Sequence, residues 1–401
     1  MTGLVRVAIV LILFGRTVHG SDLDAERISD RIQSHHTPHG VVGEARMASP
    51  DSSELVHIDD GDGAIWTGHY LAAESYRYAV TRSPVALAYA KRALETIRVL
   101  STVSGSGKLS RTVFPAGSPY IDWDHPKSDW RRTTFEGRDM YYNDSVTRDQ
   151  YEGVFIGLVA AYDLIDDAEV HALSRNLITR LADYLNSRLW IIRNPHGSRK
   201  LETYIGRFDL MLSVLQIAKH VNPEKFSGTF QITKVAWGWL VGLPSATKSR
   251  KMDGSYFGYN LNMGYLSHLV RLEKDPKRRK GFLKTYMKNR TATATHQNAY
   301  FNMIDFSVNG PDPARDQETR DLLEGYLKRS LRNFAVDLTS KYKACKQGVS
   351  CAVIPIEERP YEDFLWQRHP FRLVGWGDGS IESAGVDYIL PYWMARFYGV
   401  L

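Results

Sequence analysis

Two kinds of helical segment alternate along the chain. Segments of the first kind are apolar on nearly all sides and rich in small residues, with their polar residues gathered near the start. They occupy residues 62–80, 148–165, 203–218, 260–273, 298–308 and 385–400. A helix without a polar face is buried on all sides. These segments are therefore expected to form inner helices.

The segments between them are amphipathic. In residues 83–100 Ser83 is expected to cap a helix whose first position is Pro84, and Lys91 and Arg92 lie on its polar side. Comparable patterns occur at about 83–103, 166–190, 225–241, 275–290 and 315–334, and the segment after residue 20 supplies a sixth. Strand signals are sparse. These segments are expected to form outer helices.

Six inner and six outer helices in alternation predict an all-α (α/α)6 double-helical toroid, with one domain over residues 21–401. In that fold the inner helices surround an axis, and the loops leading into them form one face. Helix N-termini at that face carry free N–H groups and partial positive charge. The long irregular stretches 105–145 and 337–384 lead into inner helices, so we expect both to overhang this face.

The N-terminal residues 1–20 have the pattern of a signal peptide. Arg6 precedes a short apolar run, residues 7–14, and small or tolerated residues precede Ser21. The run is too short for a membrane span, and no later stretch is long and apolar enough to be one. The pattern predicts a secreted or periplasmic protein, with an uncleaved anchor as the alternative.

Composition narrows the functional classes. The chain has 401 residues, of which 43% are hydrophobic and 24% charged, so a large core is expected and disorder is not. Its net charge of +6 is spread out, as in residues 274–284, which argues against nucleic-acid binding and would suit an acidic polysaccharide. No phosphate-binding loop, nucleophile elbow or zincin motif occurs, and we expect no cofactor or metal.

The two cysteines, Cys345 and Cys351, are expected to close a short disulfide loop if the chain is exported, the alternative being two reduced thiols. Asn143 and Asn289 begin glycosylation sequons, which matter only if the source organism glycosylates. A glycan on Asn143 would occupy the space that is assigned below to substrate.

Two stretches carry a resemblance to a known family. Residues 59–81, "DDGDGAIWTGHYLAAESYRYAVT", followed by "SPVALAYAKRALETI", and residues 143–165, "NDSVTRDQYEGVFIGLVAAYDLI", resemble the first two hairpins of the six-hairpin glycosidase superfamily. Its members include unsaturated glucuronyl hydrolases, other glycoside hydrolases, polysaccharide lyases and sugar epimerases. The resemblance implies the toroid fold and an oligo- or polysaccharide substrate.

The first of these stretches contains candidate catalytic carboxylates. Asp60 and Asp62 lie in a glycine-rich loop before an inner helix, and Asp62 could cap that helix. In a hydrolase, Trp66 would stack on a sugar and His69 would orient a hydroxyl, with Tyr70 beside them. The alternatives are a plain turn with a buried His69, or a calcium loop, although the downstream ligands of a calcium loop are missing.

The second stretch places Thr147 and Gln150 at the spacing of a capping box. Arg148 and Asp149 then occupy the first helical turn, where the helix dipole favours an ionised carboxylate suited to a general base. A cation opposes that dipole, so Arg148 is expected to pair with an acid or to bind an anionic substrate. The glycines at 153 and 157 are expected to allow close helix packing.

Glycosidase chemistry uses two carboxyl groups across the scissile bond. We expect Asp60 or Asp62 to work with Asp149; Asp209, Asp305 and Asp387 are deeper alternatives. The prediction is a secreted glycoside hydrolase. The alternatives are a uronate lyase or epimerase, or a non-catalytic glycan-binding toroid. Further candidate substrate-binding residues, several of which would suit a lyase, are Asn143, Tyr151, Arg207, Asn260, His268 and Trp376.

Overall fold

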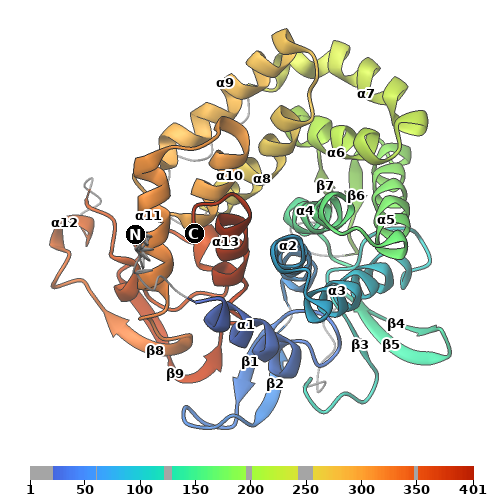
Figure 1. Ribbon diagram of the computed structural model, residues 1–401. Helices are drawn as coiled ribbons and strands as arrows, with labels where there is room; N and C mark the ends of the chain where they lie inside the picture. The colour runs from blue at the N-terminus through green and yellow to red at the C-terminus, as the bar shows by residue number, and fades with distance from the viewer. Residues whose placement is uncertain (1–20, 60, 122–128, 196–200, 243–255, 347–350) are drawn as a thin grey trace, which may run out of the picture.

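The computed structural model describes residues 21–59, 61–121, 129–195, 201–242, 256–346 and 351–401 (Figure 1). The described part of the chain is predominantly helical, with 57% of these residues in helices and the remainder including some small sheets. The expectation of a helical protein is therefore confirmed. The predicted signal peptide and Asp60 lie outside the described residues.

The apolar segments form buried helices near the middle of the molecule, here called the inner helices (Figure 1). They are α2 (Gly63–Thr81), α4 (Arg148–Leu164), α6 (Phe208–Val221), α8 (Phe257–Arg271), α10 (Ala299–Asn309) and α13 (Val386–Phe397). Helix α2 packs against α4 and α13, while α8 packs against α6 and α10. The first turns of α4 and α13 follow the long stretches 105–145 and 337–384, as the sequence predicted.

The amphipathic segments form helices nearer the periphery of Figure 1, here called the outer helices. They are α1 (Asp22–Arg31), α3 (Pro84–Thr102), α5 (Ala168–Ser187), α7 (Pro223–Trp237), α9 (Pro276–Thr293) and α11 (Pro313–Tyr326). Each of α3, α5, α7, α9 and α11 contacts the inner helix that precedes it, and α1 contacts α13. The predicted cap on α3 is confirmed, because the Ser83 side chain accepts a hydrogen bond from the Ala86 N–H.

Small antiparallel sheets were not predicted. One has the strand order β2-β1-β9-β8 and another the order β3-β5-β4, while β6 pairs with β7. The strands are β1 (Glu44–Met47), β2 (Leu55–Asp59), β3 (Val113–Pro115), β4 (Trp130–Phe135), β5 (Arg138–Asn143), β6 (Ile191–Arg193), β7 (Leu201–Thr203), β8 (Arg332–Asp337) and β9 (Val374–Glu382). Several lead into inner helices: β2 into α2, β5 into α4, β9 into α13.

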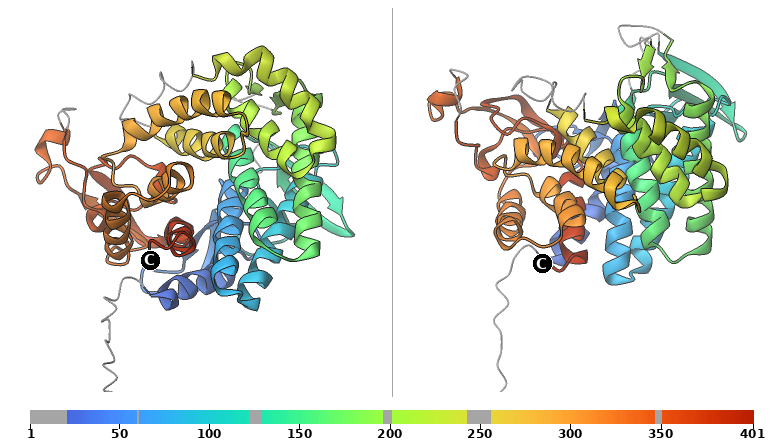
Figure 2. Two further views of the ribbon diagram at one scale, coloured as in Figure 1. Left: turned by 45° about the horizontal axis from the view of Figure 1, so that its top comes forward. Right: turned by 90° about the horizontal axis from the view of Figure 1, so that it is seen from above.

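The expected helix over 315–334 is wrong at its end, because α11 stops at Tyr326 and residues 332–337 pair with β9 instead. Short turns complete the chain: a π-turn at Ile32–His36, 3-10 turns at Gly238–Leu240, Ile356–Glu358 and Leu365–Gln367, and the four-residue α12 at Lys343–Lys346. In the right view of Figure 2, β4 to β7 lie toward one end of the helices and the C-terminus toward the other.

Glycines bring α2 and α4 into direct backbone contact. A Cβ atom added to Gly157 would lie 2.3 Å from the Gly68 carbonyl oxygen, and one added to Gly68 would lie 2.1 Å from the Gly153 carbonyl oxygen. No side chain fits in these gaps, so only glycine permits this approach. The predicted role of Gly153 and Gly157 in close helix packing is confirmed.

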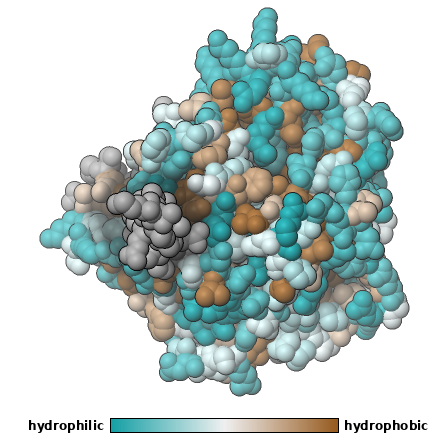
Figure 3. All heavy atoms as spheres, in the orientation of Figure 1, coloured by the Kyte–Doolittle hydropathy of each residue, from teal (hydrophilic) through white to brown (hydrophobic). Residues whose placement is uncertain are grey.

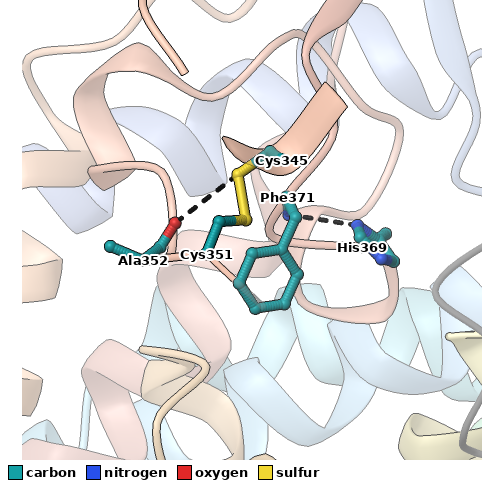
Figure 4. Close-up of a disulfide and its surroundings, with 5 residues drawn as sticks. All are labelled: Cys345, Cys351, Ala352, His369 and Phe371. Carbon is teal, nitrogen blue, oxygen red and sulfur yellow. Dashed lines mark hydrogen bonds between the residues drawn. A yellow bond between two sulfur atoms is a disulfide. The ribbon is translucent and has the colours of Figure 1, made fainter. Parts of the chain in front are cut away.

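Cys345 and Cys351 are joined by a disulfide bond (Figure 4). It closes a loop near residues 369–371, where the Phe371 N–H donates to His369 Nδ1. Across the described part of the chain, none of the helices combines the length and the apolar character that crossing a membrane requires.

Candidate functional site

The first turns of α2 and α4 bring two predicted catalytic residues together. Asp62 occupies the position before α2, and Asp149 is the second residue of α4. Both side chains are only partly buried, and Asp62 is 28% exposed. The glycine contact between the two helices contributes to this arrangement, because it lets the two helix backbones approach each other closely. We call this region the acidic mouth; Asp62 and Asp149 are its centre.

Gln150 links the two carboxyl groups. Its side-chain amide donates to Asp62 Oδ1 at 2.9 Å, and its backbone N–H donates to Asp149 Oδ1 at 3.1 Å. Its side-chain oxygen accepts from the backbone N–H of Ile65, at 3.0 Å. One residue of α4 thus holds both carboxyl groups and the first turn of α2.

The predicted capping box is wrong. Thr147 makes no side-chain capping bond, and its hydroxyl donates to Asp149 instead. The Gln150 side chain does not cap its own helix because it bonds to the Ile65 N–H group of α2 and to the Asp62 carboxyl group instead. Asp62 likewise stands at the N-cap position of α2 without a side-chain capping bond.

Asp62 is held in an environment that opposes its ionisation. Burial raises its pKa, the guanidinium of Arg111 opposes this rise, and the charges of Asp149 and Asp363 add to it. Arg111 Nη2 lies 2.5 Å from Asp62 Oδ1, so the carboxyl group is oriented from both sides. Asp149 accepts from the Thr147 hydroxyl and lies in the first turn of α4.

Further acidic residues extend the acidic mouth toward the sheet of β1 and β2. Asp363 accepts two hydrogen bonds from Arg368, at 2.8 and 2.6 Å. Burial and the charge of Asp363 raise the pKa of Glu44 to about 7, against a hydrogen bond from the Tyr361 hydroxyl that lowers it. Glu44 lies directly across the β1–β2 pair from Asp59. Clusters of carboxyl groups with displaced pKa values are typical of functional sites.

A surface hollow of about 460 Å³ adjoins this cluster. Glu44, Asp59, Arg46, His57 and Tyr120 contribute to its lining. Asp59, which contributes to this lining, ends β2 three residues before Asp62. The hollow offers space for a polar ligand beside the candidate acids.

Most predicted substrate-binding residues are buried in the core. Trp66 is only 6% exposed and stacks on Phe364, with ring centroids 4.5 Å apart. His69 is fully buried and its Nδ1 bonds to the Ile65 carbonyl oxygen. The hydroxyl groups of Tyr70 and Tyr151 contact Gln33 and the Leu109 N–H respectively. These four side chains pack between helices and do not face the acidic mouth as open surfaces.

The two candidate arginines have protein partners. Arg148 pairs with Glu202 at 2.6 Å and donates to the Thr203 carbonyl oxygen, so it ties α4 to β7. This accounts for a cation at a helix N-terminus. Arg207 pairs with Asp209 at 2.9 Å and also bonds Asn262.

The remaining candidates are dispersed. Asn143 ends β5, and its side chain accepts from the Ser145 N–H. Asn260 is 1% exposed in α8, whereas Trp376 on β9 is 77% exposed. Asn289 is buried and accepts from Asn262, which leaves no room for a glycan on it. His268 lies in the last two turns of α8, far along the helix from its start.

The deeper aspartates are held in the interior. Asp209 pairs with Arg207, and Asp305 pairs with Arg315 at 2.7 Å. Asp387 is fully buried and accepts from the Tyr326 hydroxyl and the Leu365 N–H. Their contacts are those of structural carboxylates. Among the described residues, no group of three or more His, Cys, Asp or Glu side chains is arranged to hold a metal ion.

Sequence reasoning missed Gln150 as a link, and Arg111, Glu44 and Asp363 altogether. Arg111 and Asp363 carried a weak signal, since they lie in the long stretches 105–145 and 337–384 that lead into α4 and α13. Comparisons of the chain with protein-family models, with curated proteins and with solved structures gave no match.

Proposed function

We propose that the inner and outer helices form an (α/α)6 toroid of the six-hairpin glycosidase type, and that the protein is an exported glycoside hydrolase. The contacts of α2 with α4 and α13, and of α8 with α6 and α10, support a closed ring of inner helices. The acidic mouth lies at the N-terminal ends of α2 and α4, where the loops of such a ring converge.

One observation carries the proposed activity: Gln150 holds Asp62 and Asp149 side by side. Burial and the charges of Asp149 and Asp363 raise the pKa of Asp62, while the charge of Arg111 opposes the rise. Asp149 accepts hydrogen bonds from the Thr147 hydroxyl and the Gln150 N–H at the start of α4. Glycosidic hydrolysis uses two carboxyl groups, one as an acid and the other as a base or nucleophile.

In the proposed reaction Asp62 is the general acid and Asp149 the general base. Asp62 donates its proton to the glycosidic oxygen as the C–O bond breaks, and Asp149 takes a proton from the water that attacks the anomeric carbon. Arg111 and Gln150 keep the Asp62 carboxyl group oriented throughout. After turnover, the proton gained by Asp149 passes to solvent and Asp62 is reprotonated.

The contacts of the other candidates favour hydrolysis over the lyase or epimerase alternative. A uronate lyase needs a free base and a free cation at the substrate carboxylate. Arg148 and Arg207 are both ion-paired, and His69 and Tyr151 are fully buried. The expected substrate is an oligo- or polysaccharide that enters from the hollow beside Glu44 and Asp59.

The test is the single replacement of each central acid. Asp62→Asn and Asp149→Asn should each lower the release of reducing ends from a glycan panel by about 10²- to 10⁴-fold, because each removes one proton-transfer step. Asp183→Asn is the matched control; it removes an exposed carboxylate that pairs with Lys225 on the outer helices, and turnover should not change.

The same assay separates the alternatives. A lyase would produce ultraviolet absorbance from a new double bond without consuming water, and a glycan-binding toroid would bind without forming product. Full turnover by folded Asp62→Asn and Asp149→Asn variants would contradict the proposal.

A further inference from the structure

A second cavity lies between the inner helices, at the end opposite the acidic mouth. Its volume is about 140 Å³, and residues of α2, α4, α8, α10 and α13 line it. Leu164, Arg271 and Phe397 at its outer end are the last residues of α4, α8 and α13. Figure 3 shows the molecule in the orientation of Figure 1. Hydrophobic residues lie among hydrophilic ones near the middle of this face.

The cavity has the size of one small ring. Its wall is largely apolar and includes Ala72, Ile156, Val159, Ala160, Leu390 and Met394. An apolar cavity of about 150 Å³ stays dry and accepts benzene. A six-membered ring therefore fits, and a sugar, whose hydroxyl groups need partners on all sides, does not.

One polar group at the inner end has no partner. Tyr300 lines the cavity and is 2% exposed, and its hydroxyl makes no side-chain hydrogen bond within the described part of the chain. Glu152 lies next to this end: a Cβ atom added to Gly264, which lines the cavity, would lie 2.0 Å from Glu152 Oε1. Neither carboxyl oxygen of Glu152 has a hydrogen-bond partner among the described residues. Buried polar groups left unpaired cost free energy that a bound polar atom would recover.

The ionisable groups at the cavity are paired, exposed at its rim or shifted by burial. Burial, and then the charge of Asp149, raise the pKa of Glu152 well above its usual range. Burial and the charge of Arg271 lower the pKa of His268 to about 4. Asp163 is already paired with His220 at 2.7 Å, and Arg271 is exposed at the rim. Burying an ion here without a partner would be costly.

We propose that this cavity binds an uncharged six-membered ring that carries one hydroxyl group, with the apolar wall enclosing the ring and Tyr300 as the hydrogen-bond partner of the hydroxyl. This site is independent of the proposed hydrolase activity, because it lies at the other end of the helices and shares no residue with the acidic mouth.

The test uses the full chain with phenol and benzene as probes, measured by calorimetry or ligand-detected NMR. Phenol should bind with a Kd on the order of 1 mM, as expected for so few heavy atoms. Tyr300→Phe should weaken phenol binding by about 2- to 10-fold and leave benzene binding unchanged, because only the hydrogen bond is lost.

Tyr286→Phe is the matched control. It removes an equally buried hydroxyl, which donates to Asp305 Oδ1, from outside the cavity, and phenol binding should not change. Ala160→Leu fills the cavity and should abolish binding of both probes; if circular dichroism shows that it does not fold, the two tyrosine variants decide. Absence of binding to the wild-type chain at about 10 mM probe, or equal effects of both tyrosine changes, would overturn the proposal.

Discussion

The two ends of the inner helices differ in chemistry although the same helices build both. At the N-terminal ends of α2 and α4, Asp62 and Asp149 meet with Arg111 and Gln150 in a partly exposed charged cluster. At the C-terminal ends, the helices enclose a largely apolar cavity, whose polar lining residues include tyrosines and, at the rim, Asp163 and Arg271. One helix can therefore contribute an acid at its first turn and an apolar wall two turns later.

The physical cause of the contrast is the direction of the helices. Free N–H groups and the dipole stabilise carboxylates at the first turn, whereas the later turns have satisfied backbone groups and can face a dry space. Stability and ligand binding at the acidic mouth should thus depend on pH, whereas those at the cavity should not. Both should depend on the packing of α2 against α4.

The largest expected effect comes from separating α2 and α4. Gly157→Ala places a Cβ atom 2.3 Å from the Gly68 carbonyl oxygen, a backbone atom that cannot move aside. The free energy of unfolding should fall by about 3 kcal/mol, and both sites should be impaired. Urea denaturation measures the loss, with glycan turnover and phenol binding as readouts of the two ends.

Gly281→Ala is the control for that change. Gly281 lies on the exposed side of α9 with open space around it, so the same substitution should raise stability by up to about 1 kcal/mol. If both variants shift the free energy of unfolding in the same direction, Gly157 is not required for the close packing of α2 and α4.

The next largest effect concerns the ionisation of a single buried carboxyl group. Glu382 on β9 is buried; burial would raise its pKa, but hydrogen bonds from His36 and Arg31 and their charges lower it to about 2. A lowered carboxyl pKa means that its stabilisation is complete above about pH 4.5 and is lost as the pH falls toward 2. The shift corresponds to about 3 kcal/mol.

Glu382→Gln should therefore lower the free energy of unfolding by about 3 kcal/mol at pH 7, with the difference from wild type shrinking as the pH is lowered toward 2. Urea denaturation between pH 2 and 7 gives both curves. Glu95→Gln, which removes an exposed carboxylate paired with Arg98, should change stability by less than about 0.5 kcal/mol. A constant difference across the pH range would show that Glu382 acts by packing.

The helices could be predicted from the sequence because their signals are local. The uninterrupted apolar character of residues 148–165 and the cap at Ser83 both depend on neighbours within a few positions, and both segments are helical as expected. The small residues of the sequence likewise predicted the close packing of α2 and α4. Strand β8 was missed because its pairing with β9 depends on residues about 40 positions apart.

The candidate site could be predicted only in part, for the same reason. Asp62 and Asp149 were found because each precedes or begins an apolar helix. Gln150 bonds to Asp62, and Asp363 lies close enough to Glu44 to raise its pKa, only because segments distant in the sequence come into contact. Arg148 was expected either to pair with an acid or to bind substrate, and its partner Glu202 could not be named because it lies 54 positions away, in a hairpin that no local pattern connects to it.

The smallest expected effect tests whether the cavity end is insensitive to pH. The hydroxyl groups of Tyr76 and Tyr398, which both line the cavity, lie 3.3 Å apart, and the Tyr398 ring stacks on Phe306. Tyr398→Phe keeps the stacking and removes one neutral hydrogen bond, so the free energy of unfolding should fall by only about 0.5–1 kcal/mol. Burial raises the pKa of Tyr76 well above its usual range, so the loss should be the same at pH 5 and pH 8. Guanidinium denaturation at both values measures it. A loss that differed between the two pH values would mean that charge reaches this end as well, and the contrast between the two ends would fail.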